Sequence, residues 1–353
     1  MNDLNHYIYQ CLMRSEDLVV VTIIRDQGAT PRTAGARMAI RRNGDFMGTI
    51  GGGLLEAQAL QKAEVVFENK TSSVEMVDMT QNQLNETHMI CGGRLEFLME
   101  YLPAEPLTTE LYKKVQKILQ NRQKGMLIVN LGDLKNLKKP IERFLILEDS
   151  RLYGSKPDEA EVEKIKTLTR NLDTAQLIMI ENCFFWVDPL SPSNVLYIFG
   201  AGHVARPTAK IGLQLGFRTL VFDDRREFAN PDHFPFPIET VVLPNFNRCF
   251  SEFTVNPDCY VVIVTRGHSH DKTVLAQALK TDAGYIGMIG SHRKRDMIYD
   301  ALLAEGFTQK DIDRVNSPIG LNIGAETPEE IAISIMAELI QYRSKKRGTW
   351  KKR

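Results

Sequence analysis

Short apolar runs separated by segments of helical periodicity fill the C-terminal half of the chain. Thr327-Pro328-Glu329-Glu330 has the form of a capping box and predicts a helix that continues through Tyr342. Strands that alternate with helices are typical of a doubly wound parallel sheet. The runs of strand length, each bounded by turn residues, are VLYIF (195–199), TLVF (219–222), ETVVL (239–243), CYVVIVT (259–265) and GYIGMIG (284–290).

The N-terminal half has a different pattern, in which strand-like runs, turns and helical segments are mixed without regular alternation. Leu18 to Ile24 is predicted to form a buried strand, and Asn43-Gly44 between two strand-like arms predicts a β-hairpin. Residues 54–68 have the periodicity of a helix, and residues 72–80 and 93–102 are predicted as strands. The chain is therefore predicted to be an α/β protein, with a mixed α+β N-terminal domain ahead of a Rossmann-like doubly wound parallel sheet.

Polar, turn-rich segments divide the chain into four predicted parts. The length of 353 residues is that of two to three domains, and the clearest boundary falls in the turn-rich segment from Pro189 to Asn194. We expect an α+β domain over 1–102, a middle α+β segment and linker over 103–192 that packs with it, a Rossmann-like domain over 193–342 and a basic tail over 343–353.

Composition and charge exclude several classes of partner. The 44 basic residues balance 44 acidic ones, which argues against a nucleic-acid or membrane-surface partner. No run of eighteen apolar residues occurs, and the N-terminus lacks the pattern of a secretory signal, so we expect a cytoplasmic protein. The five cysteines are scattered and form no CxxC pair, which argues against a disulfide framework and against a structural zinc site.

A glycine-rich turn after the run 195–199 has the form of a dinucleotide-binding motif. Gly200 can make the tight strand-to-helix turn, and Gly202 lets the backbone approach a pyrophosphate at the helix N-terminus. Asp223 follows at about the spacing at which a carboxylate meets a ribose hydroxyl, whereas Arg225 and Arg226 behind it could hold an additional phosphate. Alternatively, the glycines make only a close turn, and no nucleotide binds.

Three loops that follow predicted strands have many polar residues, and the carboxyl ends of such strands are where ligands bind. His203 lies in the first loop, Arg266, His268 and His270 lie in the second, and Ser291 lies in the third. We expect them to line one anion-attracting cleft, although Ser269, Asp271 and Ser291 could instead be helix caps. An HxH pair without a third ligand does not define a metal site, and we predict none.

Two motifs of the N-terminal half are further candidates for cofactor binding. Cys91 lies beside His88, Gly92, Gly93 and Arg94, where a nearby cation would favour the thiolate needed for sulfur transfer or metal ligation. The alternative for a single cysteine is a small buried hydrophobic side chain. The turn Gly51-Gly52-Gly53 opens the predicted helix 54–68 and offers a second N-terminus to phosphate, with Glu56 in its first turn.

These segments together resemble the XdhC/CoxI family, accessory factors for xanthine dehydrogenase and related molybdenum hydroxylases. The resemblance implies a dimer with an N-terminal domain joined to a Rossmann domain. It also implies binding of the molybdenum cofactor (molybdopterin), help with its sulfuration by a cysteine desulfurase, and delivery to the apoenzyme. The similarity is carried by GTIGGGLLEA and MICGGRLEFLMEYL in the N-terminal half, and by YIFGAGHVARP, FDDR, VTRGHSHD, YIGMIGSHRKR and SPIGLNIGAETPEEIAISIMAELI in the C-terminal half.

The chain departs from the family pattern at one position. The resemblance implies a cysteine after the glycines of the N-terminal motif, where this chain has Gly53 or Leu54. Cys91 is then the one thiol left in a family-like motif, so a mechanism with two cooperating thiols lacks its second thiol here.

Three functions are compatible with the sequence, and the first is favoured. A non-enzymatic cofactor chaperone explains both glycine-rich regions and Cys91. An NAD(P)-dependent oxidoreductase would use the Rossmann domain alone, with His268 or His270 as its general acid or base. A non-catalytic nucleotide or redox sensor would leave the N-terminal half as a partner-binding module.

Overall fold

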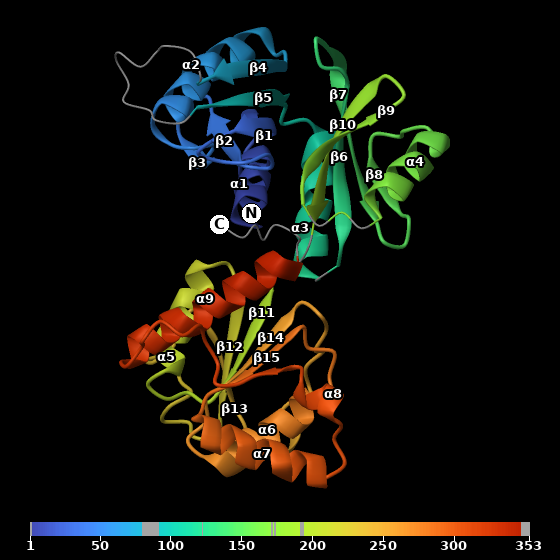
Figure 1. Cartoon of the computed structure of the whole chain (residues 1–353). Helices are drawn as coiled ribbons and strands as arrows, with labels where there is room; N and C mark the ends of the chain where they lie inside the picture. Colours follow the sequence, from blue (N-terminus) through green and yellow to red (C-terminus); the bar gives the residue numbers. More distant parts are fainter. Residues whose placement is uncertain are drawn as a thin grey trace. The chain divides into compact units, whose positions relative to one another are not determined.

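A computed structural model of the chain describes residues 2–79, 92–121, 123–170, 172, 174–190 and 194–346. The chain divides into two compact units, Met1–Pro192 and Ser193–Arg353 (Figure 1). No helix in the described ranges is both long and apolar enough to cross a membrane.

The N-terminal unit contains two antiparallel sheets, each of five strands in the described part of the chain. Their strand orders are β3-β2-β1-β5-β4 and β8-β7-β6-β10-β9. The first sheet consists of β1 (Leu18–Gly28), β2 (Arg37–Arg41), β3 (Phe46–Gly48), β4 (Ser73–Asp78) and β5 (Gly93–Leu102). The second consists of β6 (Gly125–Asp133), β7 (Asn136–Leu147), β8 (Leu152–Gly154), β9 (Gln176–Ile180) and β10 (Cys183–Leu190). The helices are α1 (Asn2–Met13), α2 (Gly53–Asn69), α3 (Pro106–Gln120) and α4 (Glu159–Thr169).

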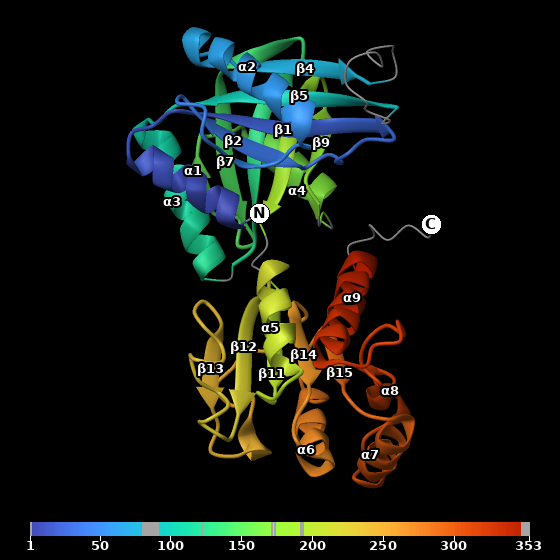
Figure 2. The same cartoon turned by 90° about the vertical axis from the view of Figure 1, so that its left-hand side faces the viewer.

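The two sheets of this unit pack against each other, and helices cover their outer faces (Figures 1 and 2). Ile24 and Leu98 of the first sheet lie in one buried cluster with Val129 and Trp186 of the second. Helix α2 buries its apolar side on the first sheet, and α4 buries Ile165 on the second. Helices α1 and α3 share a further cluster with both sheets. Residues from 103–190 therefore share cores with residues from the first hundred.

Two buried ion pairs join the sheets of the N-terminal unit. Arg37 on β2 donates from Nη1 to Oδ2 of Asp188 on β10 at 2.6 Å, and Arg143 on β7 pairs with Glu100 on β5. Exposed fractions of these side chains are 7% and 2% in the first pair, and 8% and 3% in the second. A buried charge that loses its partner is strongly destabilising, so each pair ties one sheet to the other in a fixed position.

The C-terminal unit is built on one parallel sheet, which has six strands in the described residues. Its strand order is β13-β12-β11-β14-β15-β16. The chain adds strands on one side of β11 first and then on the other, so the strand order reverses at β11, as in a Rossmann fold. The strands are β11 (Val195–Phe199), β12 (Arg218–Asp223), β13 (Glu239–Val242), β14 (Cys259–Ile263), β15 (Tyr285–Met288) and β16 (Val315–Asn316). The helices are α5 (Ala205–Gln214), η2 (Phe246–Arg248), α6 (His268–Ala278), α7 (His292–Ala304), α8 (Gln309–Ile312) and α9 (Pro328–Lys346).

Helices cover both faces of this sheet. Helices α5 and α9 share one buried cluster with it, and α6, α7 and α8 share the other (Figure 2). The four inner strands, β11, β12, β14 and β15, are buried on both sides, whereas the edge strands β13 and β16 are partly exposed. The fold class predicted from the sequence is confirmed, with antiparallel sheets in the N-terminal unit and a parallel Rossmann-like sheet in the C-terminal unit.

Local predictions are also confirmed at several places. The hairpin at Asn43-Gly44 joins β2 to β3, with the Gly44 N–H donating to the Arg41 carbonyl at 2.9 Å. The capping box at the start of α9 forms, because Thr327 and Glu330 exchange hydrogen bonds.

Helix α9 ends later than predicted. It continues past residue 342 to Lys346, so the first residues of the expected basic tail are helical. The Arg343 guanidinium lies 5.0 Å from the ring centroid of Phe217. The Lys346 Nζ pairs with Asp258 at 3.0 Å. These contacts hold the last turn of α9 on the sheet, which the sequence pattern of the tail alone does not indicate.

Replacing Asp188 with alanine is expected to lower the free energy of unfolding by about 3–5 kcal/mol, because Arg37 stays buried without its partner. Urea denaturation followed by circular dichroism measures the change. Asp149→Ala is the matched control, because its pair with Arg151 is more than half exposed, at 55% and 54%. We expect the control to leave the denaturation midpoint nearly unchanged. Equal effects of the two substitutions would contradict the role given to the buried pair.

Candidate functional site

Gly200 lies where β11 ends, at the reversal point of the parallel sheet. Its φ is +108°, and a Cβ there would overlap the carbonyl oxygen of Val264 and lie 2.9 Å from Cα of Thr265. No residue with a side chain fits this position without moving the end of β14. Gly200 is therefore required by the fold itself, whether or not a ligand binds.

Gly202, two residues further, is not required to be glycine by packing. A Cβ added at Gly202 would meet no heavy atom within 4 Å, so the protein itself leaves room for a side chain. Helix α5 begins at Ala205 and has no side-chain cap. A helix N-terminus without a cap offers free N–H groups and the positive end of the helix dipole to an anion. The backbone at Gly202 can thus approach a phosphate group closely, as the sequence motif predicts.

Asp223, at the end of β12, is buried and fully engaged within the protein. Its Oδ2 accepts the backbone N–H of Ala201 at 2.8 Å. The Arg225 guanidinium donates to both carboxylate oxygens, from Nε at 2.8 Å and from Nη2 at 3.0 Å. Burial opposes ionisation, but these hydrogen bonds from Arg225 and Ala201 hold the pKa of Asp223 below its ordinary value. The carboxylate expected from the sequence to meet a ribose thus fixes the glycine-rich loop in the structure.

The loops after β12 and β14 meet through a second ion pair. Arg266 donates from both terminal nitrogens to the two oxygens of Asp224, at 2.9 and 2.8 Å. Strands β12 and β14 are the two neighbours of β11 in the sheet. The structure therefore brings Arg266 close to the glycine-rich loop and pairs it with Asp224.

The remaining polar residues at this edge of the sheet have mixed roles. Ser291 caps α7, since its Oγ accepts the N–H of Lys294 at 3.3 Å. Asp271 is no cap; it is fully buried, accepts the Thr265 hydroxyl at 2.6 Å and pairs with Lys294. The Lys294 charge is thus paired with a buried carboxylate.

Of the three histidines of the predicted cleft, His203 lies in the loop before α5, whereas His268 and His270 lie in the first turn of α6 and not in a loop as expected. His203 and His268 are exposed, whereas the ring of His270 lies 5.2 Å from the ring of Phe246. Within the described ranges, no three His, Cys, Asp or Glu side chains gather in a way that could hold a metal ion.

The glycine triplet of the N-terminal unit leads directly into α2. Gly51, Gly52 and Gly53 have φ values of +141°, +79° and +54°, which strongly favour glycine. Oε1 of Glu56 accepts the Thr49 hydroxyl at 2.5 Å and the Gly52 N–H at 3.1 Å. The Glu56 carboxylate therefore occupies part of the N-terminus of α2, which the sequence motif predicts as a phosphate-binding position.

The segment after β1 links the two predicted motifs of the N-terminal unit. A Cβ on Gly93 would lie 2.7 Å from Cγ2 of Thr30, and a Cβ on Gly51 would lie 3.3 Å from Cβ of Pro31. Both motifs are therefore at the same end of the first sheet. The sequence analysis did not predict that this segment contacts both motifs. The turn-forming sequence Thr30-Pro31-Arg32 is the signal that could have indicated it.

Gly92 and Gly93 differ in the same way as Gly202 and Gly200. A Cβ on Gly92 would meet nothing within 4 Å, whereas Gly93 is closely packed against the backbone oxygens of Gln27 and Ala29. Gly92 is exposed, and Gly93 begins β5. Cys91 and His88 lie outside the described residues.

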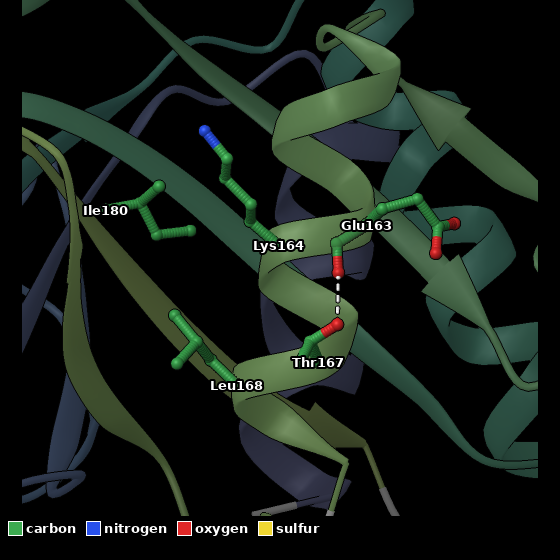
Figure 3. A pocket seen from close by; sticks show the side chains of 5 residues that line it. All are labelled: Glu163, Lys164, Thr167, Leu168 and Ile180. Carbon is green, nitrogen blue, oxygen red and sulfur yellow. Dashed lines mark hydrogen bonds between the residues drawn. The ribbon is translucent and has the colours of Figure 1, made fainter.

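An apolar hollow of about 400 Å³ lies between α4 and β9, and none of its lining residues belongs to the motifs described above (Figure 3). Leu168 and Ile180 supply its apolar lining, and Thr167 turns its hydroxyl to the Glu163 carbonyl at 2.8 Å. The cation at its rim, Lys164, is paired with Glu181. Since it lacks convergent polar groups, this hollow does not have the character of a cofactor site.

Comparison with known proteins connects both units to one family. A family model described as "XdhC Rossmann domain" matches residues 196–339, and one described as "XdhC and CoxI family" matches residues 11–78. A Bacillus subtilis (strain 168) protein named as a probable xanthine dehydrogenase subunit is 26% identical over 94% of both chains. The "Molybdenum cofactor insertion chaperone PaoD" of Escherichia coli (strain K12) is 20% identical over 96% of this chain and 87% of its own length.

A crystal structure described as a xanthine dehydrogenase from Bacillus halodurans has a similar fold. Its TM-score is 0.81, with 27% identity over 98% of each chain. The two family models together match more than half of the 353 residues and include both the glycine triplet and the glycine-rich loop of the Rossmann unit. The chain belongs to the XdhC and CoxI family of xanthine dehydrogenase accessory proteins.

Proposed function

We propose that this protein binds the molybdenum cofactor and inserts it into an apo molybdenum hydroxylase of the xanthine dehydrogenase type. The observation that carries the proposal is the contrast between Gly200 and Gly202. The fold requires the first glycine, whereas the second leaves an open approach to the uncapped N-terminus of α5. A glycine that packing does not require, at a helix N-terminus, suits a phosphate-bearing ligand.

The molybdenum cofactor fits this loop through its phosphate. The uncapped N-terminus of α5 would receive the phosphate, and Arg266 lies on the neighbouring loop. The relatives support this choice among phosphorylated ligands, because one is named as a molybdenum cofactor insertion chaperone and another as a probable xanthine dehydrogenase subunit. In this role the protein acts as a carrier rather than as a catalyst.

Sulfuration of the cofactor is the finer part of the proposal. Cys91 would act as a sulfur or molybdenum ligand, with a cysteine desulfurase as the partner that supplies sulfur. The open backbone at Gly92 supports access to this part of the chain. We further propose that the protein works as a homodimer, which analytical ultracentrifugation of the purified chain measures directly.

The alternative functions use the Rossmann unit to bind NAD(P) or another nucleotide. They are separated from the proposal by measuring binding of the molybdenum cofactor and, separately, of NADH and NADPH to the purified protein. We expect saturable binding of the molybdenum cofactor and transfer to the apo hydroxylase. Tight nicotinamide binding with substrate-dependent reduction, and no affinity for the molybdenum cofactor, would refute the chaperone function.

Gly202→Ala is expected to weaken binding of the molybdenum cofactor by at least about tenfold, because a methyl group would stand where the phosphate approaches. Its thermal midpoint should stay close to that of the wild type, since the added Cβ meets no neighbour. Gly200→Ala is the contrasting variant, and we expect it to destabilise the fold by about 1–3 kcal/mol. Calorimetric titration and thermal denaturation measure the two effects. Unchanged affinity in a folded Gly202→Ala protein would remove the loop from the binding site.

Cys91→Ser is expected to reduce the activity that the protein confers on apo xanthine dehydrogenase by at least about tenfold, because the serine hydroxyl is neither a persulfide carrier nor a soft ligand. Cys183→Ser is the matched control, as Cys183 is an exposed free cysteine at the start of β10. Activation assays with purified components measure the effect. Equal activation by the Cys91 variant and the wild type would exclude both roles of Cys91.

A further inference from the structure

We infer that Asp223 and Arg225 form a specificity pair that closes the ribose position of this Rossmann unit. The glycine-rich loop then accepts a phosphate-bearing ligand and rejects adenine dinucleotides such as NADH. For the identity of the accepted ligand, this inference rests on the proposed function. Its structural basis is the hydrogen bonding of the two acidic residues at the end of β12.

The Asp223 carboxylate has no acceptor position left for a ribose. An ionised carboxylate offers about four lone-pair sites on its two oxygens. Oδ1 accepts from the backbone N–H of Arg225 at 3.0 Å and from its Nε at 2.8 Å. Oδ2 accepts from the Ala201 N–H at 2.8 Å and from Nη2 of Arg225 at 3.0 Å. A ribose diol would have to displace two of these four donors.

Arg225 is also held in place from its other side. Its guanidinium carbon lies 3.8 Å from the ring centroid of Phe228, in a cation–π contact. The side chain of Asp223 is 3% exposed, whereas that of Arg225 is 25% exposed. The arginine therefore lies over the carboxylate on the solvent side. Its removal would break two charge-assisted hydrogen bonds and the contact with Phe228.

Asp224, the next residue, is also paired with an arginine. Each of its carboxylate oxygens accepts one nitrogen of Arg266, in a fork that joins the loops after β12 and β14. Both carboxylates after β12 are thus bound to arginines of this chain. The phosphate side of the loop differs, because Gly202 is open and no side chain caps α5.

The closed ribose position and the open phosphate position together give selectivity against dinucleotides. A dinucleotide on this loop would gain its pyrophosphate contacts, but its ribose hydroxyls would be left without the acceptor that the Rossmann fold usually supplies. A site that leaves buried polar groups unpaired discriminates strongly against the ligand that carries them. A ligand that approaches through a phosphate alone suffers no such loss.

Calorimetric titration with NADH tests the pair directly. The wild type is expected to show no saturable binding up to millimolar NADH. Arg225→Ala frees two acceptor positions on Asp223 and is expected to bind NADH at least about tenfold more tightly. Arg218→Ala is the matched control, because Arg218 forms the same two-nitrogen fork with Glu239 at the opposite end of β12. The control should bind NADH no better than the wild type.

A second substitution tests whether the gain in NADH affinity depends on the freed carboxylate of Asp223. Adding Asp223→Asn to Arg225→Ala is expected to abolish the gain in NADH affinity. Thermal denaturation checks that each variant is folded, and Arg225→Gln, which retains one side-chain donor, replaces Arg225→Ala if the alanine variant does not fold. No gain in a folded Arg225 variant would overturn the inference. Micromolar NADH binding by the wild type would also overturn it.

NADPH supplies a further outcome, since Arg225 and Arg226 could hold a 2′-phosphate. Saturable NADPH binding by the wild type that is lost in Arg225→Ala would show that Arg225 leaves Asp223 to bind a ligand. That result would overturn the inference. Binding of the molybdenum cofactor is measured on the same samples. Its absence in a wild type that also rejects NADH would refute the proposed function while leaving the closed ribose position intact.

Discussion

The close approach of β11 and β14 at Gly200 is the constraint on which the C-terminal unit depends. The Gly200 N–H donates to the Phe222 carbonyl at 2.7 Å, and the Val264 N–H donates to the Phe199 carbonyl at 2.8 Å. Hydrogen bonding thus continues past the end of β11 to both of its neighbours, and a Cβ at Gly200 would prevent it. The loops that carry Gly202, Asp223 and Arg266 meet because these three strands end together.

A different constraint governs the N-terminal unit. Its two sheets share apolar clusters, which set no unique register between them because apolar contacts are not directional. The pairs Arg37–Asp188 and Glu100–Arg143 are directional, and each would be very costly to separate while buried. They place residues from the two halves of this unit in one arrangement. The segment after β1, which contacts both Gly51 and Gly93, is held at one end of that arrangement.

The two units share a way of using glycine that bears on function. In each motif, one glycine is enforced by backbone packing and a nearby one faces open space, as in Gly93 and Gly92, or Gly200 and Gly202. The enforced glycines explain the fold, whereas packing within the protein gives no reason for glycine at the open positions. Acidic side chains also form hydrogen bonds with the backbone of two glycine-rich turns, Glu56 with the N–H of Gly52 and Asp223 with the N–H of Ala201. Such bonds hold each loop in one conformation, and an ordered loop in general loses less conformational entropy when it binds a ligand.

The sequence by itself determined the fold class, the hairpin at Asn43-Gly44, the capping box of α9 and the glycine-rich turn, because each depends on local periodicity or turn chemistry. It also placed Arg266 and Asp223 at one edge of the sheet, since the ends of neighbouring parallel strands lie together. Only the tertiary structure decided which charges pair. Asp223 binds Arg225 and Ala201, Asp224 binds Arg266, and Asp271 binds Lys294. Spacing in the sequence indicates which residues lie near one another. A carboxylate can accept hydrogen bonds from any of several nearby donors, however, and the distances and burial in the folded backbone determine which donor it binds.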